Sequence, residues 1–320
     1  MKRLGKVLLV LSVVLGIAFV ALRTPDTDPA AMRAKYGAAP SQFVDLGGGL
    51  TVHLRDEGPR DAQVIMLLHG SNADLHTWEP WAAALRGDYR VIRFDTIGHG
   101  LTGPAPDKDY SADAMPALVG RVADKLGLGK FVLGGNSMGG GISVAYALAH
   151  QNRLAGLVLV DAGGAPKPGG EPGNIGFKLA AMPGVNQIMK WITPRAIVER
   201  SLSQSVTNQA IVAPAAVDRY WELLRYPGNR EATMIRMTAP RRTFDPAKLA
   251  AIKVPTLILW GEEDKLIGPG AGEWYQRAIP GSTLKIYPKI GHLPQEEAPD
   301  RTLTDLKGWL KASGVSGNPG

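Results

Sequence analysis

Six strand-like apolar runs, most of them separated by helical patterns, constrain the fold of this chain more than any other feature. The runs begin at residues 64, 89, 130, 154, 256 and 282, and read VIMLLHG, YRVIRFD, KFVLGG, LAGLVLVD, TLILWG and STLKIYP. Apolar runs of this kind are typical of strands that are covered on both faces. Helical patterns lie at about 77–86, 111–126, 138–150 and 299–312. The alternation predicts an α/β fold, with a mainly parallel sheet and helices on both of its faces.

Two more segments complete the predicted sheet, and a long segment lies outside it. QFVDL and LTVHLRD flank three glycines and predict a hairpin, which brings the sheet to eight strands. Residues 163–250 contain no strand-like run; they begin with the Gly/Pro-rich stretch GGAPKPGGEPG and continue with helical segments. We interpret residues 163–250 as a helical cap inserted into a core formed by residues 41–162 and 251–320.

The first 25 residues differ from the rest of the chain. Three basic residues precede an uncharged apolar run of 16 residues, Val7–Leu22, and no clear small-residue cleavage site follows it. This pattern favours a membrane anchor over residues 1–24, with a cleaved signal and a secreted protein as the alternative. The basic residues ahead of the run predict that the bulk of the chain lies outside the cytoplasm, in the periplasm or the extracellular space. Residues 25–40, rich in Pro, Asp and Ala, are expected to form a tether.

The residue types that the chain lacks exclude several kinds of site. There is no cysteine, which excludes disulfides, thiolate metal ligands and a cysteine nucleophile. The six histidines show no spacing typical of a zinc enzyme, and no phosphate-binding loop with its lysine is present. We therefore expect neither a metal nor a cofactor. Nucleic-acid binding is not expected either, because no motif accompanies the net charge of +7.

Ser137 stands at the point where a strand would turn sharply into a helix. It follows FVLGGN and precedes an apolar helical pattern, with Gly135 and Gly139 two residues to either side. This order is that of a nucleophile elbow, in which the turn exposes the serine hydroxyl and leaves the next amide, here that of Met138, able to stabilise an oxyanion. The pattern alone is a weak motif in a chain with 39 glycines. A base and an acid at the same sheet edge are needed to support it.

His292 and two aspartates supply candidates for that base and acid. His292 lies directly after the last strand and is the only histidine beyond residue 150. Asp264 follows the strand at 256, and Asp161 follows the strand at 154. A serine nucleophile needs a histidine base, and the histidine needs a carboxylate, which in chain order stands between the two. We predict the triad Ser137, Asp264 and His292, with Asp161 as the alternative acid, and expect Glu262 and Glu263 to be surface charges.

Five segments in this order resemble the α/β-hydrolase superfamily over nearly all of residues 41–313. They are HGS at 69, DTIGHGLT at 95, GNSMGG at 135, WGEED at 260 and GHLPQEEAP at 291. The resemblance implies a serine hydrolase in which the residue after His-Gly, here Ser71, supplies a second oxyanion amide beside that of Met138. Asp95 and His99 are expected to hold a turn, His69 to shape the turn at Ser71, and His53 and His150 to lie at the surface.

The predicted cap is expected to set specificity. It contains 12 Lys and Arg residues against 6 Asp and Glu, together with six aromatic residues. An amphipathic cap over an apolar cleft suits an acyl or aryl group. The basic excess would face solvent, an anionic membrane or a carboxylated substrate.

Three functions fit this sequence. The first is hydrolysis of carboxylic esters through an acyl-enzyme. The second is hydrolysis of carbon-carbon bonds in ring-cleavage products, because GNSMGG also resembles the elbow of those enzymes and Arg195 could bind a carboxylate. That group commonly has Trp after the histidine, where this chain has Leu293. The third is a non-catalytic binding protein on the same fold. Dehalogenase and epoxide-hydrolase relatives use an aspartate nucleophile, so Ser137 argues against both.

Overall fold

The computed structural model of the protein describes residues 2–166, 174–240 and 242–315. Within these ranges one sheet has eight strands in the order β1-β2-β4-β3-β5-β6-β7-β8, as the apolar runs predict. The strands are β1 (Ser41–Asp45), β2 (Thr51–Glu57), β3 (Val64–Leu68), β4 (Arg90–Phe94), β5 (Phe131–Asn136), β6 (Leu154–Val160), β7 (Thr256–Gly261) and β8 (Thr283–Tyr287).

The pairing of the strands determines which loops meet. β1 and β2 form the predicted hairpin, β2 pairs antiparallel with β4, and all other neighbouring strands are parallel. Every residue of β3, β5 and β7 is buried, which explains why these runs are apolar without alternation. Because parallel strands end at the same edge, the loops after β3, β5, β6, β7 and β8 lie together.

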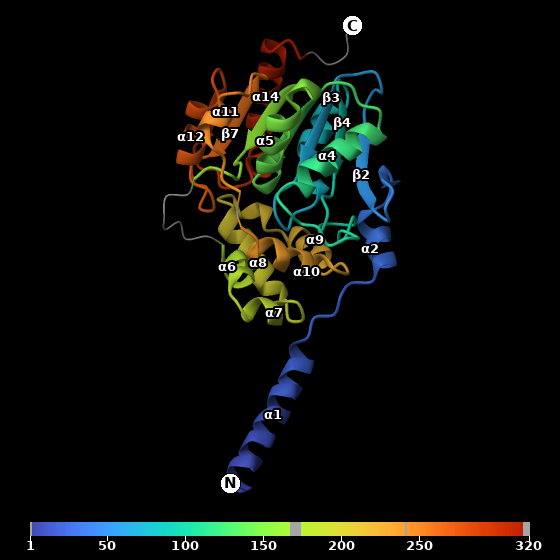
Figure 1. The fold of residues 1–320 in the computed structure, drawn as a ribbon, viewed down its shortest axis with the longest axis vertical. Helices are drawn as coiled ribbons and strands as arrows, with labels where there is room; N and C mark the ends of the chain where they lie inside the picture. The colour runs from blue at the N-terminus through green and yellow to red at the C-terminus, as the bar shows by residue number, and fades with distance from the viewer. Residues whose placement is uncertain (1, 167–173, 241, 316–320) are drawn as a thin grey trace.

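Helices cover both faces of the sheet (Figure 1). One apolar cluster joins the sheet to α4, α5 and α12, and a second joins it to α3 and α14. The core helices are η1 (Leu75–Trp78), α3 (Glu79–Leu85), α4 (Ala114–Lys125), α5 (Met138–His150), η2 (Gln151–Arg153), α11 (Pro246–Leu249), α12 (Gly270–Ala278), α13 (Pro294–Glu297) and α14 (Pro299–Ala312).

A group of helices between β6 and β7 occupies the place of the expected cap. Figure 1 shows them gathered at one end of the core. The described residues between β6 and β7 contain no strand. Within this group, α8 packs against α9 and α6. The cap helices are α6 (Ile175–Ala181), α7 (Val185–Met189), α8 (Arg195–Ser205), η3 (Gln209–Ile211), α9 (Pro214–Leu224) and α10 (Asn229–Thr238).

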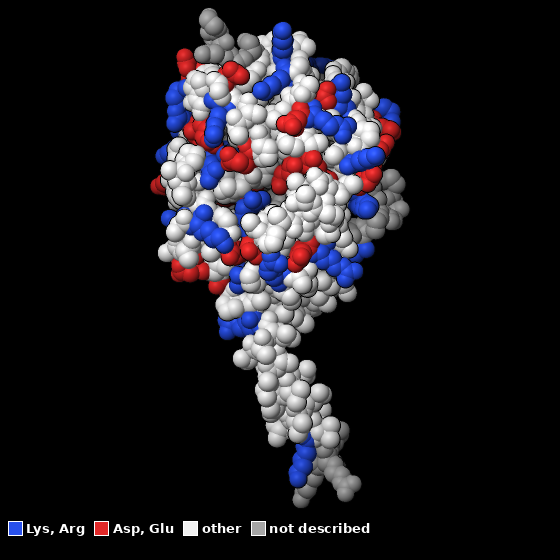
Figure 2. Space-filling model, turned by 180° about the vertical axis from the view of Figure 1, so that it is seen from behind, with Lys and Arg blue, Asp and Glu red and all other residues white. Residues whose placement is uncertain are grey.

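The N-terminal helix α1 (Lys2–Leu22) extends away from the rest of the molecule (Figure 1). Twelve of its large apolar side chains between Val7 and Leu22 are exposed. No helix of the described residues combines the length and the hydropathy that a membrane span needs. Figure 2 shows a white surface along this helix, whereas basic and acidic side chains are mixed over the body.

The segment after α1 packs on the body instead of forming the expected open tether. Residues 29–36 form α2 (Pro29–Tyr36), which begins with Asp28 accepting from the amide of Ala31 at 2.7 Å. Met32 of α2 is buried against Leu101 and against cap residues of α9 and its C-terminal end. The proline at the first helical position and the aspartate cap before it explain why so short a helix forms here.

Candidate active site

Ser137 lies on a strained turn between β5 and α5. Its φ of 53° and ψ of −114° are unusual for a residue with a side chain. The amide of Ser137 donates to the carbonyl of Val160 at 2.9 Å, and its carbonyl accepts from the amide of Gly163 at 2.8 Å. These bonds tie the turn to the end of β6 and hold the serine in a conformation that it would not adopt alone.

Glycines make this turn possible because no side chain would fit. A Cβ on Gly135 would lie 2.2 Å from the carbonyl carbon of Gly139, and one on Gly139 would lie 2.3 Å from the carbonyl oxygen of Leu68. A Cβ on Gly140 would lie 2.5 Å from that of Ala162. The run GNSMGG therefore allows α5 to approach β3 and the end of β6 closely, which brings Ser137 to the sheet edge.

His292 and Asp264 are joined on the adjacent loops. The Nδ1 of His292 lies 2.6 Å from Oδ2 of Asp264, and both residues are buried. The other carboxylate oxygen of Asp264 accepts from the amides of Leu266 and Ile267 at 2.7 and 3.0 Å, which fixes the carboxylate on its loop. Because a carboxylate can only accept, Nδ1 carries the proton and Nε2 is left as the basic nitrogen.

Asp161, the alternative acid, is completely buried next to this pair. Its Oδ1 accepts from the amide of Gly261 at 3.0 Å, and its Oδ2 has no hydrogen-bond partner. Burial first, and then the neighbouring Asp264, raise the pKa of Asp161 well above its usual range. Its surroundings therefore favour the protonated form of Asp161, and Asp264, not Asp161, is the carboxylate bonded to the histidine.

One cluster of possible metal ligands occurs among the described residues, and it is this same group. Ligand atoms of Asp161, Asp264 and His292 lie within 4.8 Å of one another. However, Nδ1 of His292 and Oδ2 of Asp264 are bonded to each other, and a protonated Asp161 offers no charge to a cation. The cluster is built for hydrogen bonding rather than for metal ligation.

Ser71 and Met138, the expected oxyanion residues, lie side by side. The Ser71 hydroxyl is 3.6 Å from the sulfur of Met138. Below them, Nε2 of His69 accepts from the amide of Thr96 at 3.0 Å, and its Nδ1 donates to the carbonyl of Gly70 at 2.7 Å. Burial lowers the pKa of His69, which keeps the ring neutral and suits it to shaping this turn.

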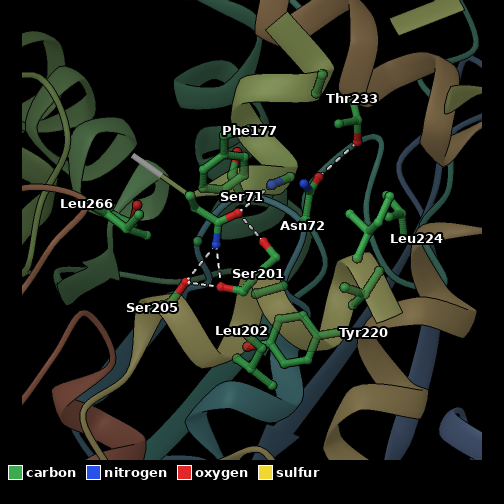
Figure 3. A pocket seen from close by; sticks show the side chains of 18 of the residues that line it. Ser71, Asn72, Phe177, Ser201, Leu202, Ser205, Tyr220, Leu224, Thr233 and Leu266 are labelled. Atoms are coloured by element: carbon green, nitrogen blue, oxygen red, sulfur yellow. Dashed lines mark hydrogen bonds between the residues drawn. The ribbon is translucent and has the colours of Figure 1, made fainter. Parts of the chain in front are cut away.

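A cavity between the cap and the sheet edge contains these groups. It encloses about 920 Å³ with its mouth, and Ser71, Ser137 and His292 line it. Figure 3 shows Phe177, Leu202, Leu224 and Leu266 around it. Five more apolar side chains from the cap line it, together with several polar ones: Ala180, Met189, Ile197, Val198 and Met234. The cap therefore contributes both apolar and polar side chains to the cavity that contains the candidate nucleophile.

Polar contacts connect the walls of the cavity (Figure 3). Asn174 donates to the hydroxyl of Ser205 at 3.0 Å, and Ser201 donates to Asn174. On the other side, the hydroxyl of Thr233 in α10 donates to Asn72 at 2.9 Å, which joins the cap to the loop after β3. These groups satisfy one another and leave the apolar surface as the main contact for a ligand.

Two cap arginines differ in their relation to the cavity. Arg195, the candidate carboxylate ligand, does not line it; its guanidinium pairs with Asp218 at 2.6 Å and Glu199 at 3.0 Å. Arg230 does line the cavity, but it pairs with Asp26 at 2.6 Å and donates to the carbonyl of Thr24 at 2.8 Å. Arg195 therefore lies outside the cavity, and the Nη atoms of Arg230 are paired, while its Nε has no partner among the described residues.

The expectation for His53 is wrong. His53 is fully buried, with Nδ1 2.7 Å from Oδ2 of Asp95 and Nε2 2.9 Å from the hydroxyl of Ser41. Asp95 also accepts from the amides of Leu75 and Leu101, both at 2.8 Å, so it holds the turn as predicted. Its partner His53 is 42 residues away in sequence, which is why the strand pattern alone did not indicate burial.

Two residues that sequence reasoning missed hold the histidine loop. Asn136 is buried and donates to the carbonyl of His292 at 3.0 Å. Glu297 accepts from four amides: Gly291 at 3.0 Å and Leu293 at 3.3 Å in the histidine loop, and Thr207 at 2.8 Å and Asn208 at 3.0 Å in the cap. A polar residue ending a buried strand was the available signal for Asn136.

Similarity to known proteins identifies the family of this chain. The family described as alpha/beta hydrolase fold matches residues 63–299. The chain belongs to this family. Its relatives include an Escherichia coli K12 enzyme, 2-hydroxy-6-oxononadienedioate/2-hydroxy-6-oxononatrienedioate hydrolase, which is 29% identical over 275 residues, covering 82% of this chain and 93% of that protein. The protein is therefore an α/β-hydrolase.

Two solved structures show how far the similarity extends. A thermophilic esterase from Thermogutta terrifontis is 27% identical, with a TM-score of 0.70 over 86% of this chain and 99% of that chain. A bacterial membrane phospholipase A is 23% identical, with a TM-score of 0.75 over 98% of this chain and 99% of that chain. The second match shows that the fold is shared over nearly the whole chain.

Proposed function

We propose that this α/β-hydrolase cleaves carboxylic esters through an acyl-enzyme on Ser137. The observation that carries the proposal is geometric: Ser137 stands on a strained elbow in the same cavity as His292, whose far nitrogen is bonded to Asp264. A serine, a histidine and an oriented carboxylate are the three parts that activate a serine nucleophile near neutral pH.

The proposed reaction has two half-reactions, acylation and deacylation, in which the same groups act in the same order. Nε2 of His292 takes the proton as the Ser137 hydroxyl oxygen attacks the ester carbonyl, and Asp264 stabilises the imidazolium. The oxyanion accepts hydrogen bonds from the backbone amides of Ser71 and Met138. Collapse of the tetrahedral intermediate breaks the bond to the alcohol, which leaves with the proton from His292. Water then repeats the sequence on the acyl-enzyme and releases the acid.

Ester hydrolysis is favoured over carbon-carbon bond hydrolysis by the lining of the cavity. The substrate in the name of the Escherichia coli relative is a dienedioate, which carries two carboxylates. In this cavity the only lysine or arginine that lines the described walls is Arg230, already paired with Asp26. The apolar cap side chains that line the cavity instead suit the acyl chain of an ester. Leu293 after the histidine also departs from the carbon-carbon hydrolases.

The test compares the two reactions on one preparation. We expect turnover of p-nitrophenyl esters, with an optimum acyl length set by the cap, and covalent labelling of Ser137 by a fluorophosphonate probe. A 2-hydroxy-6-oxo-dienedioate, followed by loss of its absorbance, is expected to react more slowly than the best ester. Faster cleavage of the dienedioate would overturn the ester assignment, and failure to label Ser137 would favour the non-catalytic binding protein.

We also propose that the N-terminal segment attaches the enzyme to a membrane, with the catalytic domain outside the cytoplasm. The support is the exposed apolar surface of α1, together with the basic residues at its start. Three more large apolar side chains are exposed in the cap, on Met182, Ile188 and Trp191. Trp191 lies at the end of α1, where its carbonyl accepts from the amide of Thr24 at 2.8 Å.

Truncation tests this attachment. Removal of residues 1–22 retains Thr24 and Asp26, which bond to the cap, and is expected to give an active enzyme that no longer sediments with lipid vesicles. The full chain is expected to sediment with them. Equal sedimentation of the two forms would refute attachment through α1, and loss of folding in the truncated form would show that α1 belongs to the core.

A further inference from the structure

A second cavity lies beside the first and is open to solvent. It encloses about 850 Å³ with its mouth and is bounded by Ser71 and Met138, the candidate oxyanion residues, on one side. The start of α4, part of α5, the glycines at 163 and 164, and residues of the segments 236–240 and 242–244 form the rest. Ser71 lines both cavities. A molecule bound across Ser71 can therefore extend into each of them.

The charged side chains that line the second cavity are basic. Its lining includes Arg236 and Arg242 and no aspartate or glutamate of the described chain. Arg242, at the exposed side, pairs with Asp113. Arg236, on α10, has no carboxylate partner among the described residues. A concave surface lined by unbalanced positive charge concentrates anions.

Arg236 bonds only to neutral groups. Its Nη1 is 3.3 Å from the carbonyl oxygen of Gly98 and 3.3 Å from Nδ1 of His99, and its Nη2 donates to the hydroxyl of Thr233 at 3.1 Å. The Nε atom is buried and has no acceptor. A partly buried guanidinium that has no counter-charge and one unbonded, buried nitrogen is costly to the fold, and an anionic ligand would offset that cost.

The ionisation of the neighbouring groups does not remove this imbalance. Burial lowers the pKa of Arg236 to about 9, which leaves it positively charged at neutral pH. Burial, and then the charge of Arg236, lower the pKa of His99 well below its usual range, so the ring is neutral. The Tyr110 phenol, whose pKa is raised by burial, is neutral as well. The described residues therefore supply no negative charge that balances Arg236.

We infer that the second cavity is a subsite for a carboxylate or phosphate group, held by Arg236, on the half of the substrate that does not enter the cap cavity. This inference rests on the proposed ester hydrolysis. The acyl half lies in the apolar cavity, the ester carbonyl lies at Ser71 and Met138, and the alcohol half carries the anion into the second cavity. The substrates are then esters of an acidic alcohol, and the guanidinium acts on binding rather than on the chemical step.

Matched aryl butanoates test the inference. The probes are 4-(butanoyloxy)benzoate, 4-(butanoyloxy)phenyl phosphate and the neutral 4-(butanoyloxy)benzamide. We expect the wild-type enzyme to prefer an anionic ester over the amide by about tenfold in kcat/KM, expressed in KM. The two anionic arms show whether the group is a carboxylate or a phosphate. Arg236→Gln is expected to abolish the preference, Arg236→Lys to keep part of it, and Arg195→Gln, which changes a surface pair on α8, to leave it unchanged.

Three results would overturn the inference. They are the absence of an anion preference in the wild-type enzyme, an unchanged preference in Arg236→Gln, and loss of the preference in Arg195→Gln to the same extent. If Arg236→Gln does not fold, the anion preferences of the wild-type enzyme and of Arg236→Lys still test the inference. Calorimetric binding of the benzoate and the benzamide to Ser137→Ala separates this inference from the proposed function: tighter binding of the benzoate supports the subsite even if no ester is turned over.

Discussion

The loops at the carboxyl edge of the sheet and the helices of the cap hold their side chains in place by different means. At the sheet edge the backbone does so: the amide of Ser137 donates to Val160 at 2.9 Å and that of Asp161 to Leu259 at 3.0 Å, which extends the strand pairing into the site. In the cap, side chains bond to one another, as Asn174 does to Ser205 at 3.0 Å. Strand pairing allows few arrangements, whereas a side-chain contact can be replaced. We therefore expect the sheet edge to carry the reaction and the cap to determine the choice of substrate.

The two regions are joined at the histidine loop. The amide of His292 donates to the carbonyl of Ser205 at the end of α8, at 2.8 Å. Glu297 accepts from amides of both the histidine loop and the cap segment at residues 207–208. Changes at the sheet edge should therefore affect turnover of every substrate, while changes at this junction should affect both regions together.

The largest effect is expected for Ser137→Ala, which tests the sheet edge alone. The variant should fold normally and lose activity by a factor on the order of 10⁴ to 10⁶, because the groups of a triad act as a unit. His292→Ala should lose nearly as much. Initial rates with the best p-nitrophenyl ester measure the loss, and circular dichroism checks the fold. Retention of more than a small fraction of the rate in either variant would show that Ser137 and His292 do not carry the reaction.

The next largest effect distinguishes the roles of the two aspartates at the sheet edge, Asp264 and Asp161. Asp264→Asn should lower kcat by about 10⁴, because the amide cannot stabilise the imidazolium or keep the proton on Nδ1. Asp161→Asn should leave kcat nearly unchanged, since it replaces a neutral acid by a neutral amide. The two variants serve as controls for each other in the same assay. A severe loss in Asp161→Asn with a mild one in Asp264→Asn would reverse the assignment of the acid.

A smaller effect is expected at the junction of the two regions. Each carboxylate oxygen of Glu297 accepts from two amides, so Glu297→Gln places an NH₂ group where two of the four amides need an acceptor. Leaving buried amides unbonded costs about 1–3 kcal/mol of unfolding free energy. We also expect kcat to fall by less than in either triad variant, because the histidine loop moves with the cap. Urea denaturation and ester turnover measure the two effects, with the exposed Glu262→Gln as the control. Equal results for the two variants would show that the junction is unimportant.

The smallest effect concerns stability and its pH dependence. The pKa of Asp161 is raised in the folded state, so the folded protein keeps a proton that the unfolded chain releases above about pH 4. The unfolding free energy that depends on Asp161 therefore falls as the pH rises from about 4 towards its raised pKa. Asp161→Asn should gain stability relative to the wild type as the pH rises above about 4. A difference that does not vary with pH in chemical denaturation would contradict the neutral state of Asp161.

The parts of the molecule that the sequence predicts best are those in which a strand is completely buried. β3, β5 and β7 begin within a residue of the predicted runs, because only a continuous apolar segment can lie inside a parallel sheet. The chain order of serine, acid and histidine then selects residues that the structure brings to one sheet edge. Their roles in catalysis, and those of the oxyanion amides, stay predictions for the variants above.

The sequence fails where a residue's surroundings come from distant segments. His53 was expected at the surface, but it is buried against Asp95, which follows another strand and is 42 residues away in the sequence. Arg195 was a candidate carboxylate ligand, yet it pairs with Asp218 and Glu199 in the cap. α2 was hidden in a segment too short and too rich in proline to show a periodic pattern. For His53, and for Arg195 with Asp218, the deciding contact is a side-chain bond to a partner far away in the sequence.

The tight packing of glycines around Ser137 has a consequence for genetics. Adding a single methyl group at Gly135, Gly139 or Gly140 would bring a carbon within 2.2 to 2.5 Å of a neighbouring atom. None of these residues carries a reactive group, yet each should be as sensitive to replacement as the serine between them. In a library of random alleles, null variants should therefore cluster at residues 135–140 rather than at Ser137 alone. A map of such alleles would outline the turn without any knowledge of the reaction.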